Sequence, residues 1–351
     1  MKHITCLLIA IILSPSLFAQ KLSSAELKKD FSVFKTALTE AHPGIYRYES
    51  KATIDSLFQQ TEKELKDSIS RQQFYRILSP SVAAMHCGHT KFNPEGEYDE
   101  NHLYHYYYGT ENLFPLKIYF AGQKAFFVDS YDKAPECEKG TEITAINGRP
   151  IDDMIAFLFK NIVADGRVVT SKYLELNNYF SAYYANLIES PGQFRLTLKK
   201  KDGDLFTATI PSTSLVRIQE YEKSHASPSG SAFNLTFPES QVALMRIKAF
   251  YPMQKGDDFD AFLKKAFAEI KEKETKKLII DLRNNEGGND RWGEMLFSYL
   301  TDKPFRYYES LRIPGKNYSF RQYAELPRFY GVLKLLMRKE PAGGYRSDFK
   351  L

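Results

Sequence analysis

The sequence predicts a multidomain α/β protein with an N-terminal helical segment, a small β-rich domain and the first part of an α/β core. Three observations lead to this prediction. Apolar residues recur at helical spacing near the N-terminus, and two strand-like runs flank Lys201-Asp202-Gly203-Asp204. A strand, a helix and a second strand then follow one another between Val242 and Asp281, which is typical of a parallel βαβ unit.

The bulk composition is that of a globular chain. It has 351 residues, enough for two or three domains, and 43% of them are hydrophobic. The net charge of +5 is spread along the chain without a basic block. A nucleic-acid footprint would need clustered basic residues, so we expect no nucleic-acid partner.

Residues 1–19 have the pattern of a secretory signal peptide. Lys2 and His3 precede an apolar run, Cys6–Leu13, and Ala19 offers a small residue at the expected cleavage point. The apolar run is too short to span a bilayer. We therefore expect an exported chain, periplasmic or extracellular, with no integral membrane segment after signal cleavage.

Two cysteines, Cys87 and Cys137, remain after signal removal. They could pair in an exported protein, but they fall in segments that we assign to different domains. Two free or buried thiols are the favoured interpretation.

Residues 20–95 are expected to form the N-terminal helical domain. Ser23 and Glu26 make a capping box, and apolar residues recur at helical spacing from Leu27 to Leu38. Two further helices are expected over Ile54–Lys66 and Gln72–Met85. Pro80 predicts a break or kink in the last of them.

Residues 105–212 are expected to form the β-rich domain. Its predicted strands are Leu113–Phe120, Ala125–Asp129, Gln193–Lys199 and Leu205–Ile210. Asn147-Gly148 predicts a tight turn after the apolar Ile143 and Ile146. We interpret Asn161–Ile188 as an irregular aromatic insert, and Ser224–Ser231 as a linker.

Residues 236–351 are expected to form the partial α/β core. Its predicted elements are the strand Val242–Ile247, the helix Asp257–Ile270 and the strand Leu278–Asp281. After Trp292 we expect a helix, a strand-like run over Phe305–Leu311 and a helix near Tyr330–Met337.

Two places carry candidate chemistry. Gly287-Gly288 follow a buried strand, where glycines let a substrate approach the backbone and leave N–H donors for an oxyanion. The same pair could equally serve only as a strand-to-helix turn. His89 could be a general base, or a capping or core histidine.

A metal site and a cofactor are not expected. His86-Cys87-Gly88-His89 lacks a second ligand pair at a suitable distance. His102 and His105 lie in a tyrosine-rich stretch and are expected to be solvated.

Taken in order, these motifs resemble the tail-specific (C-terminal processing) serine protease family, in the branch near the tricorn core protease. The motifs are His42-Pro43-Gly44, Gly88-His89-Thr90, Gly140 with Ile146-Asn147-Gly148, and Asp281-Leu282-Arg283 with Gly287-Gly288. The resemblance covers nearly all of residues 22–351. Two departures stand out, since family members commonly have Asp where this chain has Cys87 and Glu142.

The resemblance implies a fold and a chemistry. Residues 105–212 would be a PDZ-like domain that captures peptides, and residues 236–351 part of a crotonase/ClpP-like protease core. His89 would be the general base, with Gly287 or Gly288 in the oxyanion hole. Other family members use a Ser–Lys pair instead. The substrates would be peptide bonds, in unfolded or C-terminally tagged proteins.

The nucleophile is the missing part. In the family it is a serine on a later strand-to-helix turn. We expect Ser298 in a helix, Ser310 in a strand, and Ser319 and Ser347 in polar loops, so none fits that role. The sequence therefore predicts an inactive fragment. The alternatives are a non-catalytic peptide-binding protein that acts through the PDZ-like domain, and a small-ligand carrier.

Overall fold

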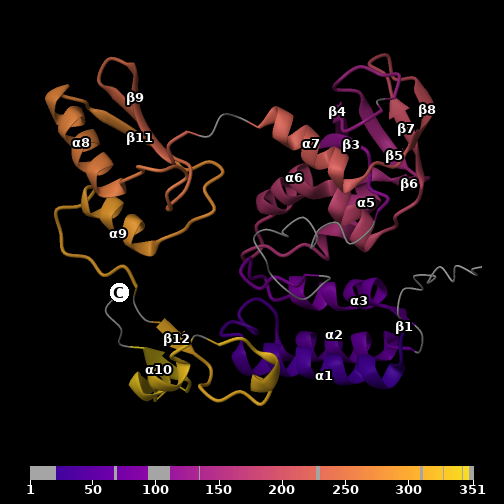
Figure 1. Cartoon of the computed structure of the whole chain (residues 1–351), viewed down its shortest axis with the longest axis horizontal. Helices are drawn as coiled ribbons and strands as arrows, with labels where there is room; N and C mark the ends of the chain where they lie inside the picture. Colours follow the sequence, from indigo (N-terminus) through magenta and orange to yellow (C-terminus); the bar gives the residue numbers. More distant parts are fainter. Residues whose placement is uncertain are drawn as a thin grey trace, which may run out of the picture. The chain divides into compact units, whose positions relative to one another are not determined.

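The computed structural model divides the chain into two compact units (Figure 1). Unit 1 comprises Met1–Ser224 and Asn317–Glu325, and unit 2 comprises His225–Lys316 and Leu326–Leu351. The residues described are 21–66, 69–93, 111–133, 135–226, 230–308, 311–326, 328–341 and 343–347. The predicted signal peptide, His102, His105 and Ser310 lie outside them. Of the helices in these ranges, none combines the length and apolarity that crossing a membrane requires.

Three helices open unit 1, and each begins at a cap that the sequence provides (Figure 1). Ser23, Ser50 and Ser70 each accept a hydrogen bond from the amide three residues further on. This confirms the three predicted helices and the capping box at Ser23. The helices are α1 (Ser24–Ala41), α2 (Lys51–Glu64) and α3 (Arg71–Ala83).

Pro80 does not break α3, which continues to Ala83. Proline has no N–H to donate to the carbonyl of Arg76. The hydroxyl of Ser79 donates to that carbonyl at 3.2 Å instead. Of the predicted break or kink, the break is wrong, since a neighbouring side chain supplies the lost donor and the helix continues. The kink stays a prediction.

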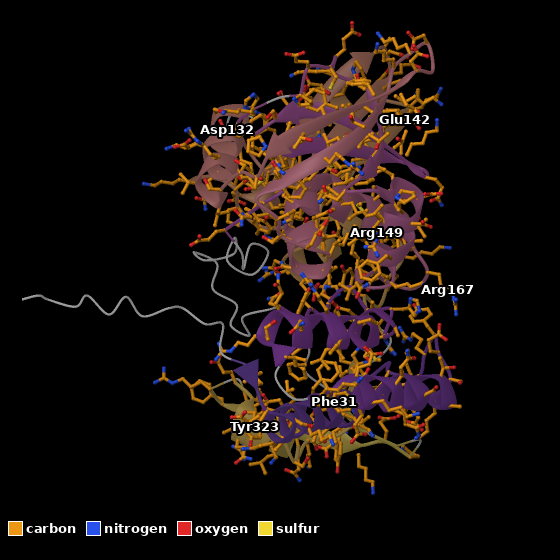
Figure 2. The ribbon with its side chains drawn as sticks, turned by 90° about the vertical axis from the view of Figure 1, so that its right-hand side faces the viewer. Phe31, Asp132, Glu142, Arg149, Arg167 and Tyr323 are labelled. Carbon is orange, nitrogen blue, oxygen red and sulfur yellow. The ribbon has the colours of Figure 1, made fainter. Side chains whose placement is uncertain are left out.

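The three helices share one apolar core. Leu27, Phe31, Phe58 and Leu78 are among its buried members, and Figure 2 shows Phe31 within the helical layer. Two short strands pair antiparallel at the edge of this layer. They are β1 (Lys21–Leu22) and β2 (Ile69–Ser70).

A six-stranded antiparallel sheet forms the second part of unit 1. Its order is β3-β4-β5-β7-β8, with β6 paired to β5. Asn147 and Gly148 connect β5 to β6 with φ angles of 50° and 80°, which confirms the predicted turn. The strands are β3 (Leu116–Ala121), β4 (Lys124–Ser130), β5 (Glu142–Ile146), β6 (Arg149–Pro150), β7 (Gln193–Lys199) and β8 (Leu205–Pro211).

The segment that we interpret as an irregular insert is largely helical, so that interpretation is wrong. Most of it forms α6 (Thr170–Leu187), with a kink at Tyr179. Leu176, Phe180 and Tyr184 recur at four-residue spacing and are buried in the core of the sheet. The aromatic residues are thus the inner face of a helix. Two other helices in unit 1 were not predicted, α5 (Ile151–Phe159) and α7 (Leu215–His225).

Unit 2 contains the predicted βαβ unit. Strand β10 pairs in parallel with β11 across α8, as predicted, and antiparallel with β9, where no strand is predicted. Phe259 and Leu263 of α8 are buried against the sheet. The elements are β9 (Phe233–Glu239), β10 (Val242–Ile247), α8 (Phe259–Glu272), β11 (Lys277–Asp281) and α9 (Asp290–Ser298).

The remaining elements are short. The helix predicted near Tyr330–Met337 is confirmed, but residues 305–308 form no strand. Phe305 packs edge-on against Phe297 of α9, with ring centroids 4.7 Å apart, so this run covers a helix instead of pairing. The elements are β12 (Leu311–Ile313), the 3₁₀ turn η2 (Arg321–Tyr323), α10 (Tyr330–Leu336), β13 (Met337–Lys339) and β14 (Tyr345–Ser347).

Two of the three predicted domains lie in unit 1, and most of the third lies in unit 2. Residues 20–95 and 105–212 both belong to unit 1. Residues 236–351 belong to unit 2, except for 317–325. The chain therefore returns to unit 1 for one short segment after α9.

Candidate active site

The loop between β11 and α9 begins at a buried aspartate. Asp281 is only 7% exposed and ends the parallel strand β11. Its two carboxylate oxygens accept from Arg283 Nε and Nη2, each at 2.8 Å. The Arg283 side chain, together with its backbone amide, holds the pKa of Asp281 well below its usual range. The carboxylate thus fixes the start of the loop, and both of its oxygens accept hydrogen bonds from Arg283.

Both glycines of the loop have backbone conformations that favour glycine. The φ angles are +98° at Gly287 and +138° at Gly288. Gly288 also forms an isolated parallel bridge with Phe250. A Cβ at position 288 would stand 2.5 Å from the Phe250 carbonyl oxygen, whereas one at position 287 would meet nothing within 4 Å. Steric crowding therefore requires glycine at 288.

The two glycine amides differ in whether they donate a hydrogen bond within the described residues. The Gly287 N–H donates to Asn285 Oδ1 at 2.7 Å, and Asn285 Nδ2 in turn donates to the Ile247 carbonyl at 3.0 Å. The Gly288 N–H makes no hydrogen bond within the described part of the chain. Of the two predicted oxyanion donors, Gly288 is the one whose amide is available.

Helix α9 begins directly after this amide. Asn289 is its N-cap and accepts from the Arg291 amide at 3.0 Å. Trp292 stacks on Phe259 of α8 with ring centroids 4.7 Å apart, which ties the first turn of α9 to the core. The positive end of the helix dipole thus lies beside the Gly288 amide, where it favours negative charge.

His89 lies in unit 1, in an exposed turn. The Thr90 N–H closes the turn on the Cys87 carbonyl at 3.0 Å. Among the residues that the structure describes, the His89 ring has no hydrogen-bond partner. Within the described residues, the backbone turn alone positions this exposed ring.

The sequence suggests His86 only as a metal ligand, whereas in the structure its ring contacts two distant segments of the chain. Its Nδ1 faces the Gly166 carbonyl at 2.8 Å and its Nε2 faces Glu49 Oε1 at 3.3 Å. Asp165 accepts from the Gly88 amide at 2.7 Å. In the sequence, Asp165-Gly166 is recognisable only as a turn dipeptide. It lies inside the segment that we interpret as irregular, and its local pattern does not indicate a contact with His86 or Gly88.

A cavity of about 160 Å³ lies beside this turn, lined by His42, His86, Cys87 and Asp165 among others. His42 Nδ1 accepts from the Gly44 amide at 3.1 Å, so its neutral ring carries the proton on Nε2. That Nε2 is buried without a partner in the described residues, and burial lowers the pKa of His42. Nowhere in the described ranges do three His, Cys, Asp or Glu side chains converge as metal ligands. Cys87 and Cys137 are free thiols, as the sequence favours.

The serines after Gly288 that the structure describes lie in other hydrogen-bonded contacts or in a paired strand. Ser298 lies in α9, as predicted, and donates to the Met295 carbonyl at 2.7 Å. Ser319, in a turn, donates its hydroxyl to Glu40 Oε1 at 2.8 Å. Ser347 ends β14 and does not lie in a loop, because its segment pairs with both β12 and β13.

The edge strands of the sheet in unit 1 decide where an extended peptide could add to it. Strand addition needs a free edge, and β3 and β8 are the two edge strands. Helix α6 lies along β3, where Asn177 Oδ1 accepts from the Phe120 amide at 2.7 Å and Ser181 donates to the Phe114 carbonyl at 2.8 Å. Helix α6 thus occupies the β3 edge at Phe120. A groove of about 610 Å³ remains between β3 and α6.

The candidate residues fall into two groups. His89 belongs to unit 1, with His86 and Asp165, whereas Gly287 and Gly288 belong to unit 2. Each group has its own network of hydrogen bonds.

Comparison with known proteins finds one family model that matches part of the chain. A model of peptidase family S41 matches residues 241–340, which include β10, α8, β11 and the glycine loop. No curated protein matches the chain.

Solved structures are similar in fold. The S499A mutant of CPAF has a TM-score of 0.55 and 14% identity, over 80% of this chain and 60% of that one. Mature CPAF complexed with lactacystin has a TM-score of 0.52 and 15% identity, over 82% of this chain and 61% of that one. The chain thus spans about three-fifths of the length of the CPAF chains. A peptidase S41 family model thus matches one segment of the chain, and the mixed α/β fold is similar to that of CPAF.

Proposed function

We propose that the protein is an exported serine-type peptidase of the tail-specific kind, near the tricorn core branch. It would cleave peptide bonds in unfolded or C-terminally tagged proteins. The observation that carries the proposal is the Gly288 amide, which has no hydrogen-bond partner in the described residues. It lies in the loop that follows the parallel strand β11, within the segment that matches the peptidase S41 family model. The CPAF-like fold supports the same assignment.

In this proposal the Gly288 N–H holds the oxygen of the scissile carbonyl as it gains negative charge. Preorganised donors of this kind act without reorganising during the reaction. Asn285 and the bridge to Phe250 support the amide, since both fix the backbone on either side of it. The N-terminus of α9 adds a favourable dipole.

His89 is the proposed general base. Its exposed ring, without a partner in the described residues, would take the proton of a serine hydroxyl during attack. Ser298 and Ser319 are not proposed as that serine, because their hydroxyls donate within α9 and to α1. A Ser–Lys mechanism remains the competing chemistry, and His89 substitution separates the two.

The PDZ-like role of residues 105–212 is a second part of the proposal. Because α6 occupies the edge of β3, an extended peptide would add to β8. Strand β8 pairs only with β7 among the described strands, and Leu205 is 63% exposed on it. Peptide capture there would present substrate without cleaving it.

The test is a peptidase assay on casein and on a substrate with an unstructured C-terminal tail. It compares the 351-residue chain with a product translated further into the downstream reading frame. We expect peptidase activity in the product that carries the nucleophilic serine, with His89→Ala lowering its kcat by roughly 10²–10⁴. Activity in the shorter chain that is lost on substituting Ser298, Ser310, Ser319 or Ser347 would show that the nucleophile lies among them. A negligible effect of His89→Ala would favour the Ser–Lys chemistry. Inactivity of both products, with peptide binding retained, would favour the non-catalytic alternative.

A further inference from the structure

We infer that Asp165 is a positioning residue for His89, within a clamp that the segment Asp165-Gly166-Arg167 and Glu49 form around the turn at 86–90. The inference rests on the proposed function, since it concerns the histidine assigned as general base. It names residues that lie 37 to 80 positions away from the turn in sequence.

The first contact of the clamp fixes the residue before His89. Asp165 Oδ1 accepts from the Gly88 amide at 2.7 Å. A Cβ at position 88 would come within 3.2 Å of Asp165 Oδ2, so the lack of a side chain at Gly88 lets the carboxylate approach the backbone. A hydrogen bond between an amide and an ionised carboxylate is stronger than one between neutral groups.

The second contact fixes the start of the turn. The Gly166 amide donates to the His86 carbonyl at 2.9 Å, and His86 Nδ1 bonds the Gly166 carbonyl at 2.8 Å. His86 has a φ of +51°, which is uncommon for a residue with a side chain. The reciprocal pair with Gly166 holds His86 in this conformation.

The third contact closes the clamp with charge. The Gly166 carbonyl and the ionised Glu49 carboxylate can only accept, so both bonds of His86 form when both ring nitrogens carry a proton. Arg167 Nη2 donates to the same Glu49 oxygen at 3.1 Å. Figure 2 shows Arg167 at the rim of unit 1, where the helical layer meets the sheet part.

The imidazole of His89 has no hydrogen bond within the described residues. Among these residues, the backbone turn sets the place of the ring, so the contacts that hold the turn also position His89. The turn is closed by the Thr90 amide and held by Asp165 and Gly166. A catalytic group displaced by about 1 Å can lose about 10²-fold in rate. Loss of the Asp165 contact should therefore misplace the base.

The experiment uses Asp165→Ala, the conservative Asp165→Asn, and Asp132→Ala as the matched control. Asp132 is exposed, and Figure 2 shows it on the opposite side of unit 1 from Arg167. Amide exchange is measured by NMR in the full 351-residue chain. We expect Gly88 to exchange about tenfold faster or more in Asp165→Ala. Asp165→Asn should recover most of the protection, because its side-chain carbonyl still accepts.

Kinetics then connect the clamp with catalysis, measured in whichever product of the peptidase assay is active. Asp165→Ala should lower kcat about tenfold or more with KM unchanged, Asp165→Asn should restore most of it, and Asp132→Ala should leave it unaltered. Unchanged Gly88 exchange, or a loss confined to KM, would overturn the inference. Faster exchange combined with an inactive wild type would instead overturn the proposed function and leave the clamp standing. If Asp165→Ala does not fold, Glu49→Gln tests the same clamp through faster exchange of the Gly166 amide, and unaltered exchange there would contradict it.

Discussion

The substitution Gly288→Ala tests the structural basis of the glycine loop. The new Cβ would stand 2.5 Å from the Phe250 carbonyl oxygen and 2.7 Å from its carbon, and both atoms are backbone. The backbone would have to shift, which costs about 1–3 kcal/mol in overpacking. The φ of +138° adds about 1–3 kcal/mol of strain for a residue with a side chain. We expect the free energy of unfolding of unit 2 to fall by about 2–6 kcal/mol.

Gly287→Ala is the matched control, because it carries the strain without the clash. Its φ is +98° and its Cβ would meet nothing within 4 Å, so the expected loss is about 1–3 kcal/mol. Trp292 is the only tryptophan in the sequence and stacks in the core of unit 2, so its fluorescence follows this unit during urea unfolding of the full chain. Equal losses in the two variants would refute the steric argument, as would a Gly288→Ala variant as stable as wild type.

Two further predictions concern other contacts. Arg283 lowers the pKa of Asp281 in the folded chain below its ordinary 3.8, so the unfolded chain binds more protons in acid. This contribution to stability is present above a pH of about 4 and is lost as the pH falls through the folded pKa. Asp281→Asn should therefore flatten the acid side of the Trp292-monitored stability profile, and an unchanged slope would contradict the assignment. Asn177→Ala should leave the Phe120 amide without its acceptor and cost about 1–3 kcal/mol in a thermal melt of unit 1, while opening the β3 edge to extended peptides. A wild-type melting temperature would show that α6 does not depend on this contact.

Local patterns were sufficient for much of the fold. Ser23 with Glu26 predicts the start of α1, and Asn147-Gly148 predicts the turn between β5 and β6, because both depend on neighbours in sequence. The βαβ unit follows from an amphipathic helix between two apolar runs. Helix α6 was missed because its aromatic-rich composition hid a regular four-residue spacing. The break at Pro80 was predicted wrongly because the effect of a proline depends on its neighbours, here the Ser79 hydroxyl that donates to the Arg76 carbonyl.

The candidate site could be predicted only in part. His89 and the glycine pair stand out because of motif and position, but the residues that hold them in place do not. Asp165 and Glu49 contact the turn from 77 and 37 positions away, which only the folded chain brings together. The sequence also leaves Gly287 and Gly288 equivalent. They differ because the side chain of Asn285 captures the Gly287 amide, a contact that depends on the path of the loop.

At Gly288, the structural and the functional explanations of the glycine come from the same geometry. In the parallel bridge, the Phe250 amide donates to the Gly287 carbonyl at 2.9 Å, and the Asn289 amide donates to the Phe250 carbonyl at 2.8 Å. The bridge therefore uses the peptide groups on either side of Gly288 and leaves its own N–H unused. The close approach that excludes a side chain at 288 is thus the same contact that turns the amide away from the sheet. Packing thus fixes an amide that has no hydrogen-bond partner in the described residues, and the proposed oxyanion stabilisation needs a rigid donor of this kind.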